Sequence, residues 1–195
     1  MPKVYTGDLT KMFDISGKKA MIFGGAGGFG EAIAAGYAAN GCSVCISSRS
    51  EEKLQAAKAK IEAAAAPGVK VMYIAGDAGD EEFVKKAVEV VTGPEGLGGC
   101  DILVNAQGIN KKMWSWEIDT DFFEKMLHTN ITSLMLTCKY FGNWMKNNNL
   151  DGDEKVEVVA GQPNTNKGYG KIINFGSVRG IRAVANGGGG NVPYN

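Results

Sequence analysis

The sequence has no excess of charge of either sign, because 21 lysines and arginines balance 21 aspartates and glutamates. Neither sign gathers into a long block, so we expect no nucleic-acid partner and no membrane-surface binding. Long apolar runs are also missing, and we therefore expect no transmembrane helix. The opening segment, Met1 to Lys19, lacks the apolar block of a signal peptide, which favours a cytoplasmic location.

Metal ligands are scarce, with four cysteines and one histidine in the chain. Cys42 and Cys45 form a C-x-x-C pair, but they belong to a strand-like segment in which an odd spacing puts side chains on opposite faces. A shared zinc ion needs both thiolates on one side. We therefore expect apolar packing of the cysteines and no metal site.

Glycine is abundant instead: 28 residues of 195, about twice the usual share. Strand-like apolar runs alternate with segments of helical period, which is typical of an α/β fold with a doubly wound parallel sheet. The length suits one domain covering 1–195, with a polar surface insertion at about 147–170. The five predicted strands are 20–23, 43–47, 69–75, 101–105 and 171–175.

Four helical stretches are predicted between these strands. The second begins after the N-cap Ser50 and the third after the N-cap Asp80. The fourth covers about 121–146 and is either continuous or broken in the middle. The first begins near Phe29, and its predicted inner face is formed by Phe29, Ile33, Gly36 and Tyr37.

A glycine-rich turn joins the first strand to the first helix. Its sequence, from Gly24 to Gly30, is G-G-A-G-G-F-G. Glycines at a strand–turn–helix junction let the backbone approach a pyrophosphate, whose charge the helix N-terminus favours. The alternative is a turn that is rich in glycine only for packing.

Further motifs follow this turn in a fixed order: Asp77 after the third strand, N-A-Q-G at 105–108, Asn130, Ser177 and Tyr194. Together they resemble the short-chain dehydrogenase/reductase family over Phe13–Asn195, most closely the branch of gluconate 5-dehydrogenase and 3-oxoacyl carrier-protein reductase. The family usually has N-N-A-G where this chain has Ala106 and Gln107, and the final glycine is kept. The resemblance implies a Rossmann-like fold that lacks the family's C-terminal strands and helices.

The end of the second strand bears on the choice of nicotinamide cofactor. The sequence Ser47-Ser48-Arg49 has no carboxylate for a ribose 2′-hydroxyl, whereas Arg49 suits a 2′-phosphate. A carboxylate ~5 Å from that phosphate would cost ~3 kcal/mol per charge pair at a dielectric of ~20. NADP(H) is therefore preferred and NAD(H) possible. Alternatively, Arg49 is solvated or pairs with Glu51 or Glu52.

The resemblance also implies a role for each motif. Tyr194 is the acid/base, Ser177 orients the substrate and Asn130 supports a water relay. Asp77 contacts the adenine. The alternative is that Asp77 only ends the third strand. The remaining expected cofactor-binding positions are Gly24, Gly27, Gly28, Phe29, Gly30, Ser48, Arg49, Ala78, Asn105, Ala106 and Gly108.

The implied activity is the interconversion of a secondary alcohol and a ketone with NADP(H), on a small-molecule substrate such as a sugar acid, polyol or acyl chain. Family members have a lysine four residues after the tyrosine, and this chain ends at Asn195. We therefore expect a truncated form of a longer enzyme, poorly active by itself and a homodimer or homotetramer when complete. The alternative is a non-catalytic dinucleotide-binding module.

Overall fold

The computed structural model describes residues 13–112, 114–149 and 170–178. Five parallel strands form one sheet in the order β3-β2-β1-β4-β5. The predicted strands are all present, with ends that differ by one or two residues. The strands are β1 (Lys19–Phe23), β2 (Ser43–Ser48), β3 (Val71–Ala75), β4 (Ile102–Asn105) and β5 (Lys171–Asn174).

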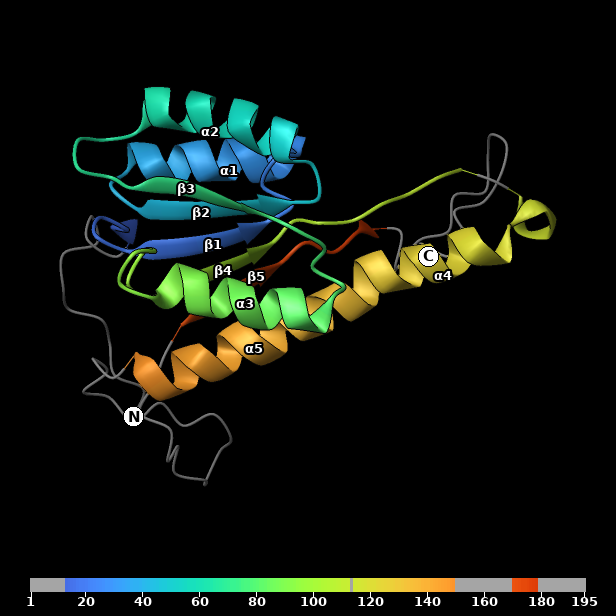
Figure 1. Ribbon diagram of the computed structural model, residues 1–195. Helices are drawn as coiled ribbons and strands as arrows, with labels where there is room; N and C mark the ends of the chain where they lie inside the picture. Colours follow the sequence, from blue (N-terminus) through green and yellow to red (C-terminus); the bar gives the residue numbers. More distant parts are fainter. Residues whose placement is uncertain (1–12, 113, 150–169, 179–195) are drawn as a thin grey trace, which may run out of the picture.

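Helices cover both faces of this sheet, as predicted for a doubly wound fold. Figure 1 shows α1 (Gly28–Ala39) and α2 (Glu51–Ala64) on one face and α3 (Glu81–Thr92) and α5 (Ser133–Asn148) on the other. The chain runs from β1 outward to β3 and then returns to place β4 on the other side of β1. The crevice between β1 and β4 is therefore the topological switch point, where ligands of such sheets bind.

Alternate residues of the four strands β1 to β4 enter two separate cores. Ala20 and Ile22 pack with α1 and α2, whereas Met21 and Phe23 pack with α3 and α5. The same division separates Cys42 from Cys45, as the strand spacing predicts. Burial raises the pKa of the Cys42 thiol to about 12.

The side-chain caps of the second and third helices are as predicted. Ser50 Oγ accepts a hydrogen bond from Lys53 N, and Asp80 accepts two from the first turn of α3. The predicted inner face of the first helix is wrong at two positions. Gly36 is exposed and Phe29 is 74% exposed, because the buried positions are Gly30, Ala34 and Ala38. Phe29 instead contacts Phe175, with ring centroids 5.7 Å apart.

The fourth helical stretch is broken in the middle. It comprises α4 (Thr120–Leu127), a π-helical turn η3 (His128–Thr132) and α5. The N–H of Ser133 donates to the carbonyl of His128, five residues back, which defines the wider turn. Since α5 continues to Asn148, the predicted insertion at 147–170 begins inside a helix, and most of it lies outside the described residues.

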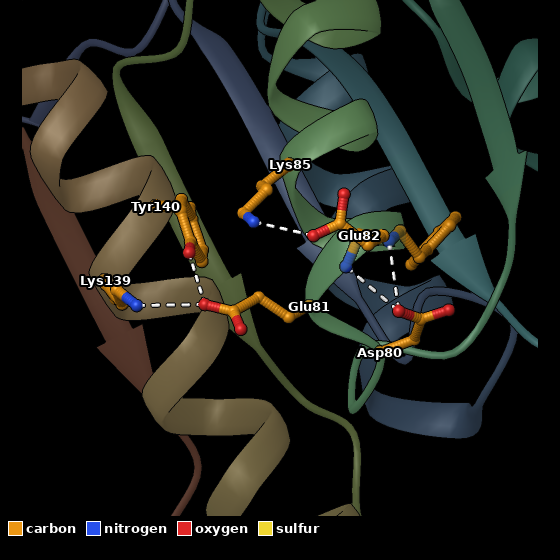
Figure 2. A network of polar contacts seen from close by, with 7 residues as sticks. Asp80, Glu81, Glu82, Lys85, Lys139 and Tyr140 are labelled. Atoms are coloured by element: carbon orange, nitrogen blue, oxygen red, sulfur yellow. Dashed lines mark hydrogen bonds and ion pairs between the residues drawn. The ribbon is translucent and has the colours of Figure 1, made fainter.

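A network of polar contacts joins α3 to α5 on the second face of the sheet (Figure 2). Glu81, in the first turn of α3, accepts hydrogen bonds from Tyr140 Oη and from Lys139 Nζ, the latter at 2.9 Å. These two donors lower the pKa of the Glu81 carboxyl. Asp80 caps the same helix, so both carboxylates stabilise the start of α3.

The β5 edge is the least covered part of the sheet. Ile172, Ile173 and Phe175 are each 41% exposed, as expected where no further strand follows in the described part of the chain. In the same part of the chain, no helix combines the length and the hydropathy that crossing a membrane requires.

Candidate dinucleotide site

A pocket of about 360 Å³ lies at the carboxyl ends of the strands, around the switch point. Its walls come from the turn after β1, the ends of β2 and β3, the loop after β4 and the π-helical turn. The lining residues are Phe23, Gly24, Ala26, Gly27, Ser47, Ser48, Arg49, Ser50, Lys53, Gly76, Asp77, Ala78, Ala106, Gln107, Gly108, Ile109, Thr129 and Ser133.

Two glycines determine the shape of the turn after β1. Gly24 has φ +73°, and a Cβ there would lie 2.6 Å from Gln107 N and 2.7 Å from the Ala106 carbonyl. A Cβ at Gly30 would lie 2.3 Å from the Gly24 oxygen. Side chains at either position would push the turn away from the β4 loop or from α1, so glycine here has a steric role as well as the predicted binding role.

The helix after this turn starts without a side-chain cap. Gly27 is the N-cap of α1, whereas α2 and α3 are capped by Ser50 and Asp80. The first N–H groups of a helix have no intrahelical acceptor, so those of α1 are available to an anion. Gly27 lines the pocket, while Gly28 and Phe29 do not line it and are exposed.

Two cations stand at the β2 end of the pocket. Arg49 and Lys53 both line it, four residues apart across the start of α2. Within residues 13–112, 114–149 and 170–178, no ion pair connects either side chain to a carboxylate, so the proposed pairing of Arg49 with Glu51 or Glu52 is not found. Lys53 is not among the residues expected from the sequence, because Arg49 precedes the N-cap Ser50 and no helical spacing links the two side chains.

Asp77 and Ala78 line the wall that follows β3, near the predicted adenine position. Asp77 Oδ1 accepts a hydrogen bond from Gly79 N at 2.9 Å, which turns the chain toward α3. Gly79 in turn lies against the His128 ring, since a Cβ there would be 2.1 Å from Nε2. The β3 loop and the π-helical turn therefore meet at this end of the pocket.

Some residues at the end of β4 and in the loop after it line the pocket, whereas others bond to neighbouring elements. Ala106 and Gly108 line the pocket, but Asn105 does not and is 1% exposed. Its Nδ2 donates to Asn174 Oδ1 and its Oδ1 accepts from Thr137 Oγ1, both at 2.9 Å. The Asn105 side chain thus joins β4 to β5 and α5 rather than facing a ligand.

The described structure includes two of the three predicted catalytic residues and does not test their grouping. Asn130, in the π-helical turn, uses both ends of its amide on the Ile109 backbone, at 2.8 and 2.9 Å. Ser177 is exposed, three residues beyond β5. Tyr194 lies outside the described residues. Asn130 therefore anchors the β4 loop, a role that its helical position alone does not reveal.

Two buried polar atoms in the pocket wall have no partner among the described residues. They are Ser47 Oγ, on a residue only 1% exposed, and Gln107 Oε1. Buried polar groups are normally paired, and a polar ligand in this pocket would supply the missing donors. Together with the glycine turn and the two cations, they fit a dinucleotide carrying phosphates and hydroxyls. No group of three or more metal-ligand side chains occurs in the described part of the chain.

These features define an α/β protein with a Rossmann-type fold. The family model for the short chain dehydrogenase matches residues 18–189, and the chain belongs to that family. A glucose 1-dehydrogenase from Gluconobacter oxydans is 31% identical over 137 residues, which are 70% of this chain and 50% of that protein.

Two further comparisons agree with this assignment. An L-rhamnose 1-dehydrogenase (NADP(+)) from Thermoplasma acidophilum is 32% identical over 145 residues, 72% of this chain and 54% of that protein. The crystal structure of a short-chain type dehydrogenase/reductase from Mycobacterium marinum matches with a TM-score of 0.76 at 27% identity, over 96% of this chain and 66% of that one. The chain thus spans about half the length of the two curated relatives.

Proposed function

We propose that this chain is the cofactor-binding part of an NADP(H)-dependent oxidoreductase that interconverts a secondary alcohol and a ketone. The observation that carries the proposal is a pair of cations beside the glycine turn, Arg49 and Lys53, neither of which has an ion-pair partner in the described part of the chain. A 2′-phosphate is the feature that distinguishes NADP from NAD, and a guanidinium binds phosphate with a planar pair of donors. The family's L-rhamnose 1-dehydrogenase, named for NADP(+), supports this choice.

The turn from Gly24 to Gly30 is proposed to hold the diphosphate on backbone N–H groups at the start of α1. Asp77 and Ala78 are proposed to lie at the adenine, and Ala106 and Gly108 beneath the ribose. When bound, the nicotinamide supplies the hydride. A ketone that accepts a hydride also needs a proton at its oxygen.

The catalytic roles remain proposals as well. Tyr194 is proposed to supply the proton, with Ser177 orienting the carbonyl. Asn130 is proposed to support the water relay indirectly, because its side-chain amide is already bonded to the Ile109 backbone. We propose a sugar acid, a polyol or an acyl chain as the substrate. The polyol and sugar classes are supported by the sugar dehydrogenases among the relatives.

We also propose that the whole protein is a homodimer or homotetramer. Ile131 and Met135, on the outer side of η3 and α5, are 60% and 50% exposed, which supports an apolar contact there. The cytoplasmic location expected from the sequence stays a prediction.

A titration of the purified chain with NADPH and with NADH, followed by nicotinamide fluorescence, tests the cofactor assignment. We expect saturable binding of both, with NADPH tighter by at least about tenfold, as one charge-assisted contact predicts. Equal affinities would refute the role of the two cations, and no binding of either would refute the dinucleotide site itself.

A further inference from the structure

One end of the Gln107 side chain is held by a chain of hydrogen bonds. Nε2 donates to Ser133 Oγ at 3.0 Å, and Ser133 Oγ donates to the Thr129 carbonyl at 2.6 Å. Ser133 has a single hydroxyl proton, which the Thr129 bond uses, so Ser133 can only accept from Gln107. The orientation of the amide is thereby determined, with its nitrogen toward α5 and its oxygen on the other side.

The other end of that amide is an unsatisfied acceptor. Gln107 lines the pocket, and its Oε1 is buried with no hydrogen-bond partner in the described structure. A buried carbonyl oxygen left unpaired is destabilising, and a donor on a ligand removes that penalty.

The location of Gln107 indicates which part of a nucleotide it meets. Its backbone N lies against Gly24, so close that a Cβ on Gly24 would be 2.6 Å away. Gly24 opens the turn that would hold the diphosphate, and the ribose is the group covalently next to the diphosphate in a nucleoside diphosphate. We propose that Gln107 determines ligand specificity by accepting a hydrogen bond from a ribose hydroxyl of the bound nucleotide. This inference rests on the proposed dinucleotide site.

Calorimetric titrations of the full 195-residue chain with ADP, 2′-deoxy-ADP, 3′-deoxy-ADP and IDP test the contact. The wild type should bind one of the deoxy nucleotides about three- to tenfold more weakly than ADP, as expected for one neutral hydrogen bond. Gln107→Ala should bind ADP more weakly than the wild type by the same factor. It should no longer distinguish that deoxy nucleotide from ADP. Gln107→Met, which keeps the length without the amide, should behave in the same way if the alanine variant unfolds.

Two control variants separate the contact from general damage. Gln55→Ala removes an exposed glutamine on α2 that bonds to Tyr73, and it should bind all four nucleotides like the wild type. Ser133→Ala removes the group that holds Gln107 Nε2 and should reduce the discrimination between ADP and its deoxy form only in part.

The possible results are distinct. If Gln107→Ala binds ADP as tightly as the wild type does, the contact does not exist. The same conclusion follows if the wild type and Gln107→Ala lose the same affinity on every deoxy nucleotide. If the substitution of Gln107 removes the discrimination between ADP and IDP instead, the acceptor meets the base amine and the ribose assignment is wrong. If the wild type binds none of the four while remaining folded by thermal melting, the dinucleotide site fails first and the contact falls with it.

Discussion

Replacing Arg49 with alanine should weaken NADPH binding far more than NADH binding. A guanidinium ~4 Å from a phosphate that carries about two negative charges gains ~2 kcal/mol in a water-like dielectric, which suits an exposed side chain. That loss corresponds to an affinity change of ~30-fold. NADH lacks the 2′-phosphate and should change less than ~2-fold, within the usual effect of a surface substitution. Parallel fluorescence titrations at fixed salt measure both affinities.

Neighbouring variants sharpen this test. Lys53→Ala should cost NADPH binding ~3- to 10-fold, since a solvated ammonium on a flexible side chain gains less than a bidentate guanidinium. Lys58→Ala is the matched control, because Lys58 lies on α2 in an ion pair with Glu62 and does not line the pocket. Equal losses of NADPH and NADH affinity in Arg49→Ala would refute the assignment of this end of the pocket to the 2′-phosphate.

Three further predictions concern the scaffold around the site. Gly24→Ala should destabilise the protein by ~2–4 kcal/mol, because φ is positive and the Cβ meets backbone, whereas Gly28→Ala, whose Cβ meets nothing within 4 Å, should melt like the wild type; equal melting would contradict the steric role. Glu81→Gln should lower the melting temperature at pH 7, and this difference should shrink as pH falls below the ordinary glutamate range. The folded-state pKa of Glu81 is lowered by Tyr140 and Lys139, so its stabilisation is complete above the unfolded pKa and disappears as pH falls through the folded one; a difference that stays constant down to strongly acidic pH would contradict this. A thiol reagent at pH 8 should label only the half-buried Cys138 in the native protein, and rapid labelling of all four cysteines would show that the described packing is wrong.

The sequence predicts the parts of the fold that depend on local chemistry. The five strands follow from apolar runs bounded by turns, and the starts of α2 and α3 follow from Ser50 and Asp80, whose short polar side chains accept from nearby N–H groups. The break in the long helical stretch is only an alternative at that level. The structure shows the break as the π-helical turn His128–Thr132. Asn130 in this turn contacts Ile109, 21 residues away, and no periodicity predicts that contact.

The inner face of α1 shows where periodicity fails. Counting apolar positions puts Phe29 inside, yet the close approach of Gly30 to Gly24 rotates the helix so that its small residues face the sheet. The pattern of apolar residues does not reveal this contact between two backbones.

The candidate site was predictable only in outline. The glycine turn, Arg49 and Asp77 stand out because of their positions after strands, and the structure places them around one pocket. Lys53 looks like any exposed helical lysine in the sequence, and Gln107 looks like a departure from a motif. The orientation of the Gln107 amide depends on Ser133, which is 26 residues away and contacts Gln107 only in the folded chain.

A crystal structure of the protein grown with NADPH tests the central claim most directly. We predict the diphosphate against the backbone of Gly24–Gly30, the 2′-phosphate between Arg49 and Lys53, and no rearrangement of the turn. Clear density for NADPH elsewhere, or a turn that stays empty at saturating NADPH, would contradict it.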